Sequence, residues 1–220
     1  NKIDKTAPSC TLSGSGTLGN NGWYTSDIEI SFNTASDSGG SGIESKGIGD
    51  YTTLTKTQST DTKGTTYTGY VRDKAGNTSA CTITVKKDST KPSCTLKTSG
   101  TEGNNGWYRG DVTISINTKN DTTSGVDVAG VGSYINGAIK TLSSDTKGTT
   151  YTGYIRDKAG NTNTCTVTVK RDSVAPTITY KNFEYRAGYD SNNFLVLTVK
   201  EDYSYDKLKT HYKHCYENRY

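Results

Sequence analysis

The sequence STDTKGTTYTGYVRDKAGNT occupies residues 59–78, and the sequence SSDTKGTTYTGYIRDKAGNT occupies residues 143–162. The two copies differ at two positions, and both changes keep size and polarity nearly constant. A repeat of 84 residues is longer than the roughly 20–50 residues of a solenoid unit and suits one small domain. The chain is therefore predicted to be a tandem array. The same spacing relates Pro8 to Pro92, Cys10 to Cys94, Trp23 to Trp107 and Cys81 to Cys165.

Short proline-containing linkers at 87–92 and 171–176 separate the repeats. We therefore predict one domain at 1–88, a second at 89–172 and a partial or divergent third at 173–220. In the third, Ile178 stands where the first cysteine of the other repeats would be. Because the chain opens with a linker-like segment, we expect an earlier module before it. Because it stops midway through a repeat, we expect the rest of the third module to be absent from this sequence; the alternative is that the array ends in a different fold.

Alternating apolar and polar residues predict an all-β fold. Ile28, Ile30 and Phe32 alternate with polar residues, which is the period of a half-buried strand. A second strand is predicted at 65–72, followed by a hairpin turn at 73–77. No segment has a sustained helical period, so we expect antiparallel β-sandwiches without helices. Glycine- and serine-rich loops are predicted at 13–22 and 34–42.

The composition fits ordered domains with thin cores. Hydrophobic residues make up 30% of the chain, but the net charge is only +4 and there are 16 tyrosines. Disordered chains usually combine higher net charge with few aromatic residues. The charge is also too small and too scattered to indicate a nucleic-acid partner.

Four cysteines bracket the two complete repeats, with a sequence separation of 71 between the members of each pair. We expect Cys10 to bond Cys81 and Cys94 to bond Cys165, although the sequence alone allows other pairings. Closing loops of this length stabilises a domain by about 4 kcal/mol in the chain-entropy model. Disulfides persist outside the reducing cytosol, so an extracellular location is predicted. The alternative is four buried free thiols in a cytosolic protein.

Three stretches resemble tandem bacterial immunoglobulin-like domains: residues 4–12, the turn at 19–24 and the hairpin at 70–77. The resemblance covers the first two repeats fully and the third weakly. It implies tandem immunoglobulin-like antiparallel β-sandwiches of the kind found in surface proteins, where they act as stalks, fibres or parts of adhesins. It also places Tyr67 and Tyr151 near a tyrosine corner, which is a packing role. It implies no ligand.

No catalytic site is expected. The only histidines are His211 and His214, so neither complete repeat can hold a Ser-His-Asp or Cys-His arrangement. These histidines and Cys215 could contribute to a zinc site, but such sites usually need four ligands. The alternative is that Cys215 pairs with a cysteine beyond the end of this chain. We predict no enzyme activity, no cofactor and no metal.

Aspartates near the linkers keep a calcium site as an alternative to this prediction. Asp73, Asp88, Asp157 and Asp172 could surround Ca²⁺ and stiffen the array, because calcium takes six to eight oxygen ligands. No EF-hand spacing occurs. The alternative is that these residues form turns and bond nearby N–H groups.

The aromatic pairs Trp23-Tyr24 and Trp107-Tyr108 occupy equivalent positions. They are possible ligand contacts, for example platforms on which a sugar stacks. The alternative is that each tryptophan seals one end of a sandwich core.

The sequence favours an extracellular spacer or stalk in a bacterial surface protein, fibre or adhesin. The alternatives are a module that binds a glycan or protein on a host or neighbouring cell, and a subunit of a filament that associates laterally. Attachment to a membrane or cell wall is expected only through regions outside this chain.

Overall fold

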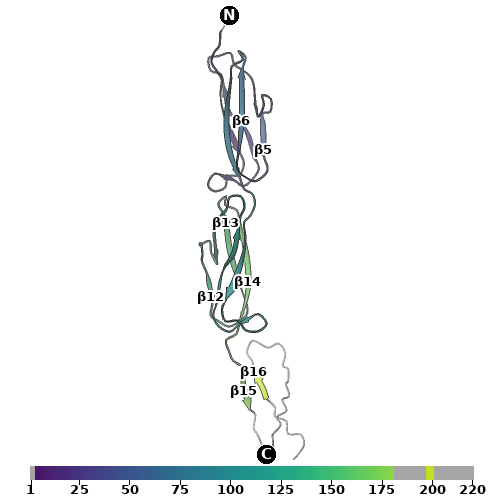
Figure 1. Cartoon of the computed structure of the whole chain (residues 1–220), viewed down its shortest axis with the longest axis vertical. Helices are drawn as coiled ribbons and strands as arrows, with labels where there is room; N and C mark the ends of the chain where they lie inside the picture. Colours follow the sequence, from purple (N-terminus) through teal and green to yellow (C-terminus); the bar gives the residue numbers. More distant parts are fainter. Residues whose placement is uncertain (1–2, 181–196, 201–220) are drawn as a thin grey trace, which may run out of the picture. The chain divides into compact units, whose positions relative to one another are not determined.

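The computed structural model describes residues 3–180 and 197–200, and every regular element within them is a β-strand. Figure 1 shows the chain with some of its strands labelled. The strands of the first repeat are β1 (Ser9–Ser15), β2 (Trp23–Tyr24), β3 (Ile28–Ser36), β4 (Ile43–Ile48), β5 (Thr55–Gln58), β6 (Thr62–Asp73) and β7 (Thr78–Lys87). The predicted all-β fold is confirmed.

The first repeat has the strand order of an immunoglobulin-like sandwich. One sheet has the order β1-β3-β5 and the other β2-β7-β6-β4. If β1, β3, β4, β5, β6 and β7 are named A, B, C, E, F and G, these sheets are A-B-E and C-F-G. The pairs β1/β3, β3/β5, β4/β6 and β6/β7 are antiparallel. The short β2 pairs in parallel with β7 and extends the second sheet.

The second repeat has the same plan. Its sheets have the orders β12-β10-β8 and β11-β13-β14-β9, and β9 pairs in parallel with β14. The strands are β8 (Ser93–Ser99), β9 (Trp107–Tyr108), β10 (Val112–Asn120), β11 (Val126–Val131), β12 (Lys140–Leu142), β13 (Thr146–Asp157) and β14 (Thr162–Arg171).

Two further strands follow the second linker. β15 (Thr177–Tyr180) pairs antiparallel with β16 (Leu197–Lys200). Ile178 lies opposite Val199 in this pair. Each sheet takes its strands from one predicted domain. The boundaries near residues 88 and 172 stay predictions.

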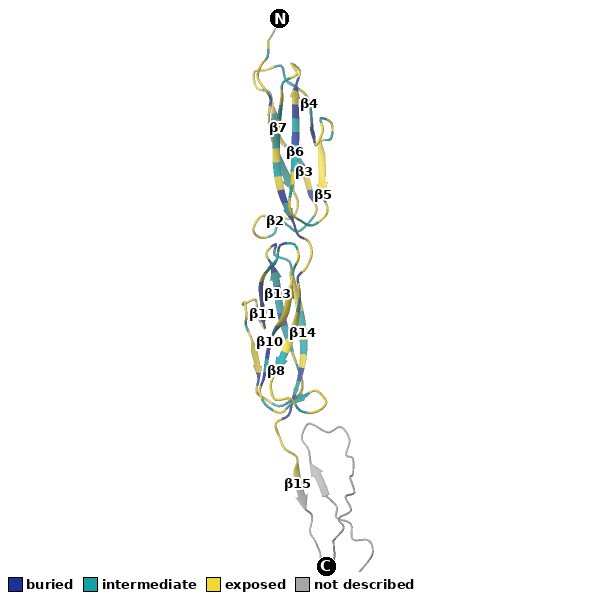
Figure 2. Cartoon of the chain, in the orientation of Figure 1, coloured by how far each residue is buried: buried dark blue, intermediate teal, exposed yellow. Residues whose placement is uncertain are grey.

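The core of the first repeat follows the alternation in the sequence. Ile28, Ile30, Ile48 and Val85 are buried together, and they come from both sheets. Figure 2 shows buried positions along β6, whereas β5 at the sheet edge is mostly exposed. Tyr67 packs against this cluster, and its hydroxyl donates to Gln58 Oε1 at 2.8 Å. Leu12, Tyr24, Phe32 and Ile83 also pack there.

Several boundaries differ from the predictions. β1 continues to Ser15 and β3 to Ser36, so the predicted loops begin too early. The polar ends of β1 and β3 are strands because they pair with each other. A prediction from composition alone does not detect this pairing. β5 was not predicted, because its sequence TKTQ has no apolar alternation. The hairpin turn after β6 has Gly76 at φ +92°, as its residue type predicts.

Candidate functional site

Each repeat contains one disulfide. Cys10 of β1 is bonded to Cys81 of β7, and Cys94 of β8 to Cys165 of β14. The Cα atoms are 5.8 Å apart in both bonds. Because β1 and β7 belong to different sheets, the bond crosses the sandwich. It joins strands A and G, whereas the disulfide of antibody domains joins B and F.

Trp23 and Tyr24, the first aromatic pair, both contact residues of their own repeat. Trp23 is 8% exposed, and Lys86 Nζ lies 5.1 Å from its ring centroid. The Tyr24 hydroxyl donates to the Gly14 carbonyl at 3.0 Å. This geometry favours the packing role, because burial and the ammonium group limit access to the Trp23 ring.

The second aromatic pair is more open. Trp107 is half-buried, with Lys170 Nζ 5.3 Å from its ring centroid. The hydroxyls of Tyr108 and Thr98 share a hydrogen bond of 2.7 Å. An open pocket beside Trp107 is lined by Thr98, Glu102, Gly103, Gly106, Tyr108 and Thr168.

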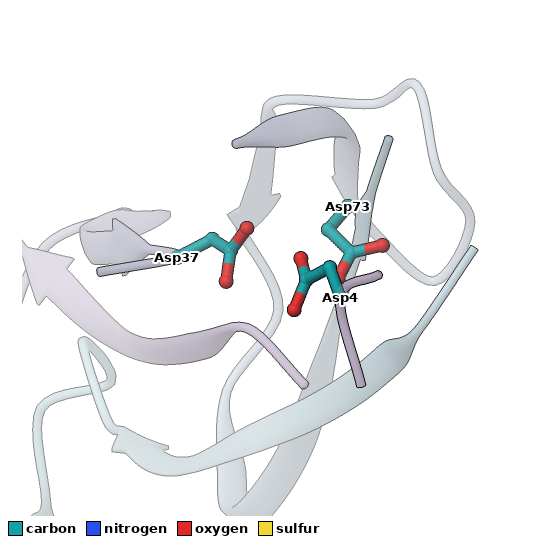
Figure 3. Close-up of side chains that lie close together, drawn as sticks. All are labelled: Asp4, Asp37 and Asp73. Carbon is teal, nitrogen blue, oxygen red and sulfur yellow. The ribbon is translucent and has the colours of Figure 1, made fainter. Parts of the chain in front are cut away.

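Three aspartates meet in each complete repeat. Their carboxylate oxygens, one from each residue, all lie within 4.8 Å of one another. Figure 3 shows the three side chains of the first group close together. We call these groups the aspartate triads. They are Asp4, Asp37 and Asp73 in the first repeat, and Asp121 and Asp157 of the second repeat with Asp88 of the linker that precedes it.

One member of each triad lies at a hairpin, between β6 and β7 in the first repeat and between β13 and β14 in the second. Asp73 is fully buried, and its Oδ1 accepts from the N–H groups of Ala75 at 2.9 Å and Asn77 at 2.8 Å. Its Oδ2 accepts from Asn77 Nδ2 at 2.8 Å. Asp157, also fully buried, accepts equivalent bonds from Asn161 at 2.8 Å and 2.9 Å. The Asp-Lys-Ala-Gly-Asn turn therefore holds this carboxylate in place.

The linker supplies the second member. Asp4 Oδ1 accepts from Thr6 N–H at 3.0 Å, and its Oδ2 accepts from Ser41 N–H at 2.6 Å. Asp88 repeats this arrangement with Thr90 N–H at 3.1 Å and Ser124 N–H at 2.9 Å. One carboxylate thus ties the linker to the loop before β4 or β11.

That loop supplies the third member. Asp37 Oδ2 accepts from Gly42 N–H at 2.7 Å, and Asp121 Oδ1 accepts from Gly125 N–H at 2.6 Å. The other oxygens, Asp37 Oδ1 and Asp121 Oδ2, are buried and have no hydrogen-bond partner. A buried polar atom normally has a partner, so this recurrence in both repeats requires an explanation.

Local contacts shift the pKa of two triad members in opposite directions. The N–H groups of Thr6 and Ser41 lower the pKa of Asp4. Burial raises the pKa of Asp157, and the charge of Asp88 adds to the rise against the opposing bonds from Asn161. The second triad therefore contains a carboxylate whose negative charge is disfavoured by its surroundings.

The sequence identified half of the triad residues. Asp73, Asp88 and Asp157 were candidates for a calcium site because they lie near the linkers. Asp4, Asp37 and Asp121 were missed, although Asp4 is the equivalent of the candidate Asp88 at the 84-residue spacing. The fourth candidate, Asp172, forms no triad within the described residues. Its Oδ1 accepts from Val174 N–H at 3.0 Å, the same turn that Asp88 makes.

A second cluster attaches each linker to the repeat that precedes it. Asp61 Oδ1 accepts from Ser89 N–H at 2.9 Å and Lys87 Nζ at 3.1 Å, and its Oδ2 accepts from the Thr90 hydroxyl at 2.6 Å. Burial opposes ionisation of Asp61, but these hydrogen bonds outweigh it and lower its pKa. In the second repeat, Asp145 contacts Arg171 and Ser173 in the same way.

His211, His214 and Cys215 lie outside the described residues, so the zinc prediction and the pairing of Cys215 stay predictions. The prediction that the chain is not an enzyme also stays a prediction.

No protein-family model and no curated protein sequence matches the chain. It is similar to the fibronectin(III)-like modules of Clostridium thermocellum CbhA at 13% identity, with a TM-score of 0.31 over 73% of this chain and 94% of that one. It is also similar to SGBP-B of the Bacteroides ovatus mixed-linkage glucan utilization locus, solved with a mixed-linkage heptasaccharide, at 15% identity. That alignment has a TM-score of 0.16 and covers 76% of this chain and 47% of the other. Because both TM-scores are below 0.5, the fold assignment depends on the strands of this chain alone.

Within the described residues, the structure has no helix that is long and apolar enough to cross a membrane. The two disulfides fit an extracellular immunoglobulin-like module.

Proposed function

We propose that the chain is an extracellular spacer or stalk, made of disulfide-clamped immunoglobulin-like repeats, in a bacterial surface protein, fibre or adhesin. The disulfides carry this proposal. Each one joins the first strand of its repeat to the last strand: β1 to β7 in the first repeat and β8 to β14 in the second. Force applied through the linkers reaches these two strands first. The bond then prevents the chain between its cysteines from being drawn out.

The linker at 87–92 supports the same role. Asp61 accepts from the Thr90 hydroxyl, and Asn161 Nδ2 donates to the carbonyls of Asp88 at 3.0 Å and Thr90 at 3.3 Å. A linker whose polar groups are bonded in this way has fewer free conformations than a Gly/Ser-rich tether, which behaves as a flexible coil. Restricted bending is what a spacer requires.

Single-molecule extension of the chain, with and without reductant, tests the proposal. Each disulfide encloses a sequence separation of 71 residues. At roughly 3.5 Å per extended residue, reduction should lengthen each unfolding step by about 250 Å. A chain carrying Cys10→Ala and Cys81→Ala should show one step that no longer responds to reductant. Equal step lengths in oxidised and reduced protein would overturn the clamp.

One observation favours a second candidate, a glycan-binding module. Trp107 is less buried than Trp23 and borders an open pocket. The test is a glycan array with the intact chain, Trp107→Ala and, as the matched control, Trp23→Ala. Binding lost only in folded Trp107→Ala would favour this candidate over a pure spacer. Binding to no glycan would remove its support.

Lateral self-association into a filament has less support. The edge strand β5 is short and carries Lys56, and both features oppose pairing with another chain. A spacer should elute as a monomer in size-exclusion chromatography with light scattering. Concentration-dependent growth would favour the filament.

A further inference from the structure

The aspartate triads concentrate negative charge. The donors that contact their carboxylates are backbone N–H groups and the side-chain amides of Asn77 and Asn161, none of which carries a net charge. Three ionised carboxylates within 4.8 Å repel one another, and more strongly where water is excluded. The ion pairs found among the described residues involve other acids: Glu44, Asp27, Asp61, Asp111, Asp127 and Asp145.

A second observation points to a ligand. Asp37 Oδ1 and Asp121 Oδ2 are buried without a hydrogen-bond partner, and they are the only carboxylate oxygens in that state among the described residues. Leaving a buried carboxylate oxygen unpaired is costly, unless it is bound to a cation. The two oxygens belong to equivalent residues of the two repeats, so the same unpaired oxygen is present in both triads.

We propose that each aspartate triad binds one Ca²⁺ ion. The donors are carboxylate oxygens, with no histidine or cysteine in the groups, and hard cations prefer such donors. Mg²⁺ requires near-octahedral geometry at short distances, whereas Ca²⁺ accepts irregular sets of six to eight oxygens. Backbone carbonyls and water would complete the shell. The proposal does not depend on the spacer role.

The ion would join three segments that are distant in sequence. In the second repeat these are the linker at Asp88, the loop at Asp121 and the hairpin at Asp157. Asp88 also holds Ser124 of the same loop by a hydrogen bond to the backbone. Calcium binding would therefore fix the path by which the linker enters the repeat. Extracellular modules bind Ca²⁺ with Kd values of about 0.1–1 mM, and we expect this range.

The test is calorimetric titration of the intact chain with CaCl₂ after removal of metal by EDTA, with MgCl₂ as a second titrant. The variants are Asp37→Asn and Asp121→Asn. Asparagine keeps an oxygen that can accept from Gly42 or Gly125, so the loop contacts are preserved. We expect each single variant to remove one bound Ca²⁺ per chain and the double variant to remove two. The matched control is Asp111→Asn, which changes an exposed acid outside the triads and should bind as the unmodified chain does.

Thermal unfolding separates a cation site from a purely structural carboxylate. In EDTA, Asp121→Asn should be at least as stable as the unmodified chain, because one repelling charge is gone. In 10 mM CaCl₂ the order should reverse, because only the intact triad gains binding energy. Equal destabilisation in both conditions would assign the carboxylate a structural role and overturn the proposal. So would absence of calcium binding by the unmodified chain, or undiminished binding by the double variant.

Discussion

The two complete repeats are nearly identical at the hairpin and differ in the cation beside the acid that binds the linker. The triads, the disulfides and the asparagines that hold the linker carbonyls recur at equivalent positions. By contrast, the cation that contacts the linker-binding acid is Lys87 in the first repeat and Arg171 in the second. The shared features are those that tie distant segments of each repeat together.

The loop after β4 or β11 shows the opposite behaviour. It is closed by a hydrogen bond from Ile48 N–H to the Thr53 carbonyl in the first repeat, and from Val131 N–H to the Ala138 carbonyl in the second. The second loop is longer and exposes Ile135. The closing bond is kept while the enclosed residues change.

Removing the disulfides should give the largest effect on stability. Cys10→Ala with Cys81→Ala should cost the first repeat about 4 kcal/mol of unfolding free energy, and Cys94→Ala with Cys165→Ala should cost the second the same. The expectation is equal because the two loops have the same sequence separation of 71 residues. Guanidinium unfolding followed by tryptophan fluorescence measures it, since Trp23 and Trp107 each report on one repeat. A loss below about 1 kcal/mol in either repeat would contradict the clamp.

Substitution of the glycine beside each disulfide should have a smaller effect on stability, and this effect should differ between the two repeats. A Cβ on Gly69 would lie 3.0 Å from Leu12 Cδ2 and from two ring carbons of Phe32. A Cβ on Gly153 would lie 2.7 Å from Leu96 Cδ2 and 3.0 Å from Cys165 Sγ. Substitution by alanine should cost about 1–3 kcal/mol through overpacking. Gly153→Ala should be the worse of the two, because a bonded sulfur cannot rotate away.

Gly64→Ala is the matched control for these glycine variants. A Cβ there would lie 3.6 Å from Thr84 Cγ2, an ordinary contact on an exposed strand, so the change should stay within about 0.5 kcal/mol. Denaturant midpoints give all three values. If Gly69→Ala and Gly153→Ala matched this control, the sheets would have to be packed more loosely at the disulfides than the structure indicates.

The sequence predicted the sandwich because a period of two directly encodes which face is buried. Ile28 and Ile30 are buried as predicted, and the hairpin turn was visible from its glycine and asparagine. It did not predict β5, whose pairing with β3 depends on the partner strand. The triads were only half visible for a related reason. Asp37 lies in a loop, and only folding brings it beside Asp4 and Asp73.

Replacing Asp61, the acid that binds the linker, should have the smallest effect on stability of the changes considered. The dependence of that stability on pH should reveal it. Because the folded-state pKa of Asp61 is lowered, its contribution to stability is fully present above the unfolded pKa, near 4. It is lost as pH falls from there toward the lower folded-state pKa. Asp61→Asn should therefore lower the unfolding free energy of the first repeat by about 1 kcal/mol at pH 7. It should also make that free energy depend less on pH between about pH 4 and pH 2.

Thr90→Val is the partial counterpart of this acid variant. It removes the hydroxyl that donates to Asp61 Oδ2 at 2.6 Å but leaves the carboxylate and its other donors in place. It should flatten the pH profile less than Asp61→Asn does. Urea unfolding of each variant across this pH range measures the difference. If the first repeat of Asp61→Asn lost stability in acid as steeply as the unmodified chain, the titrating group would have to be another carboxylate, and the linker would be held by neutral hydrogen bonds alone.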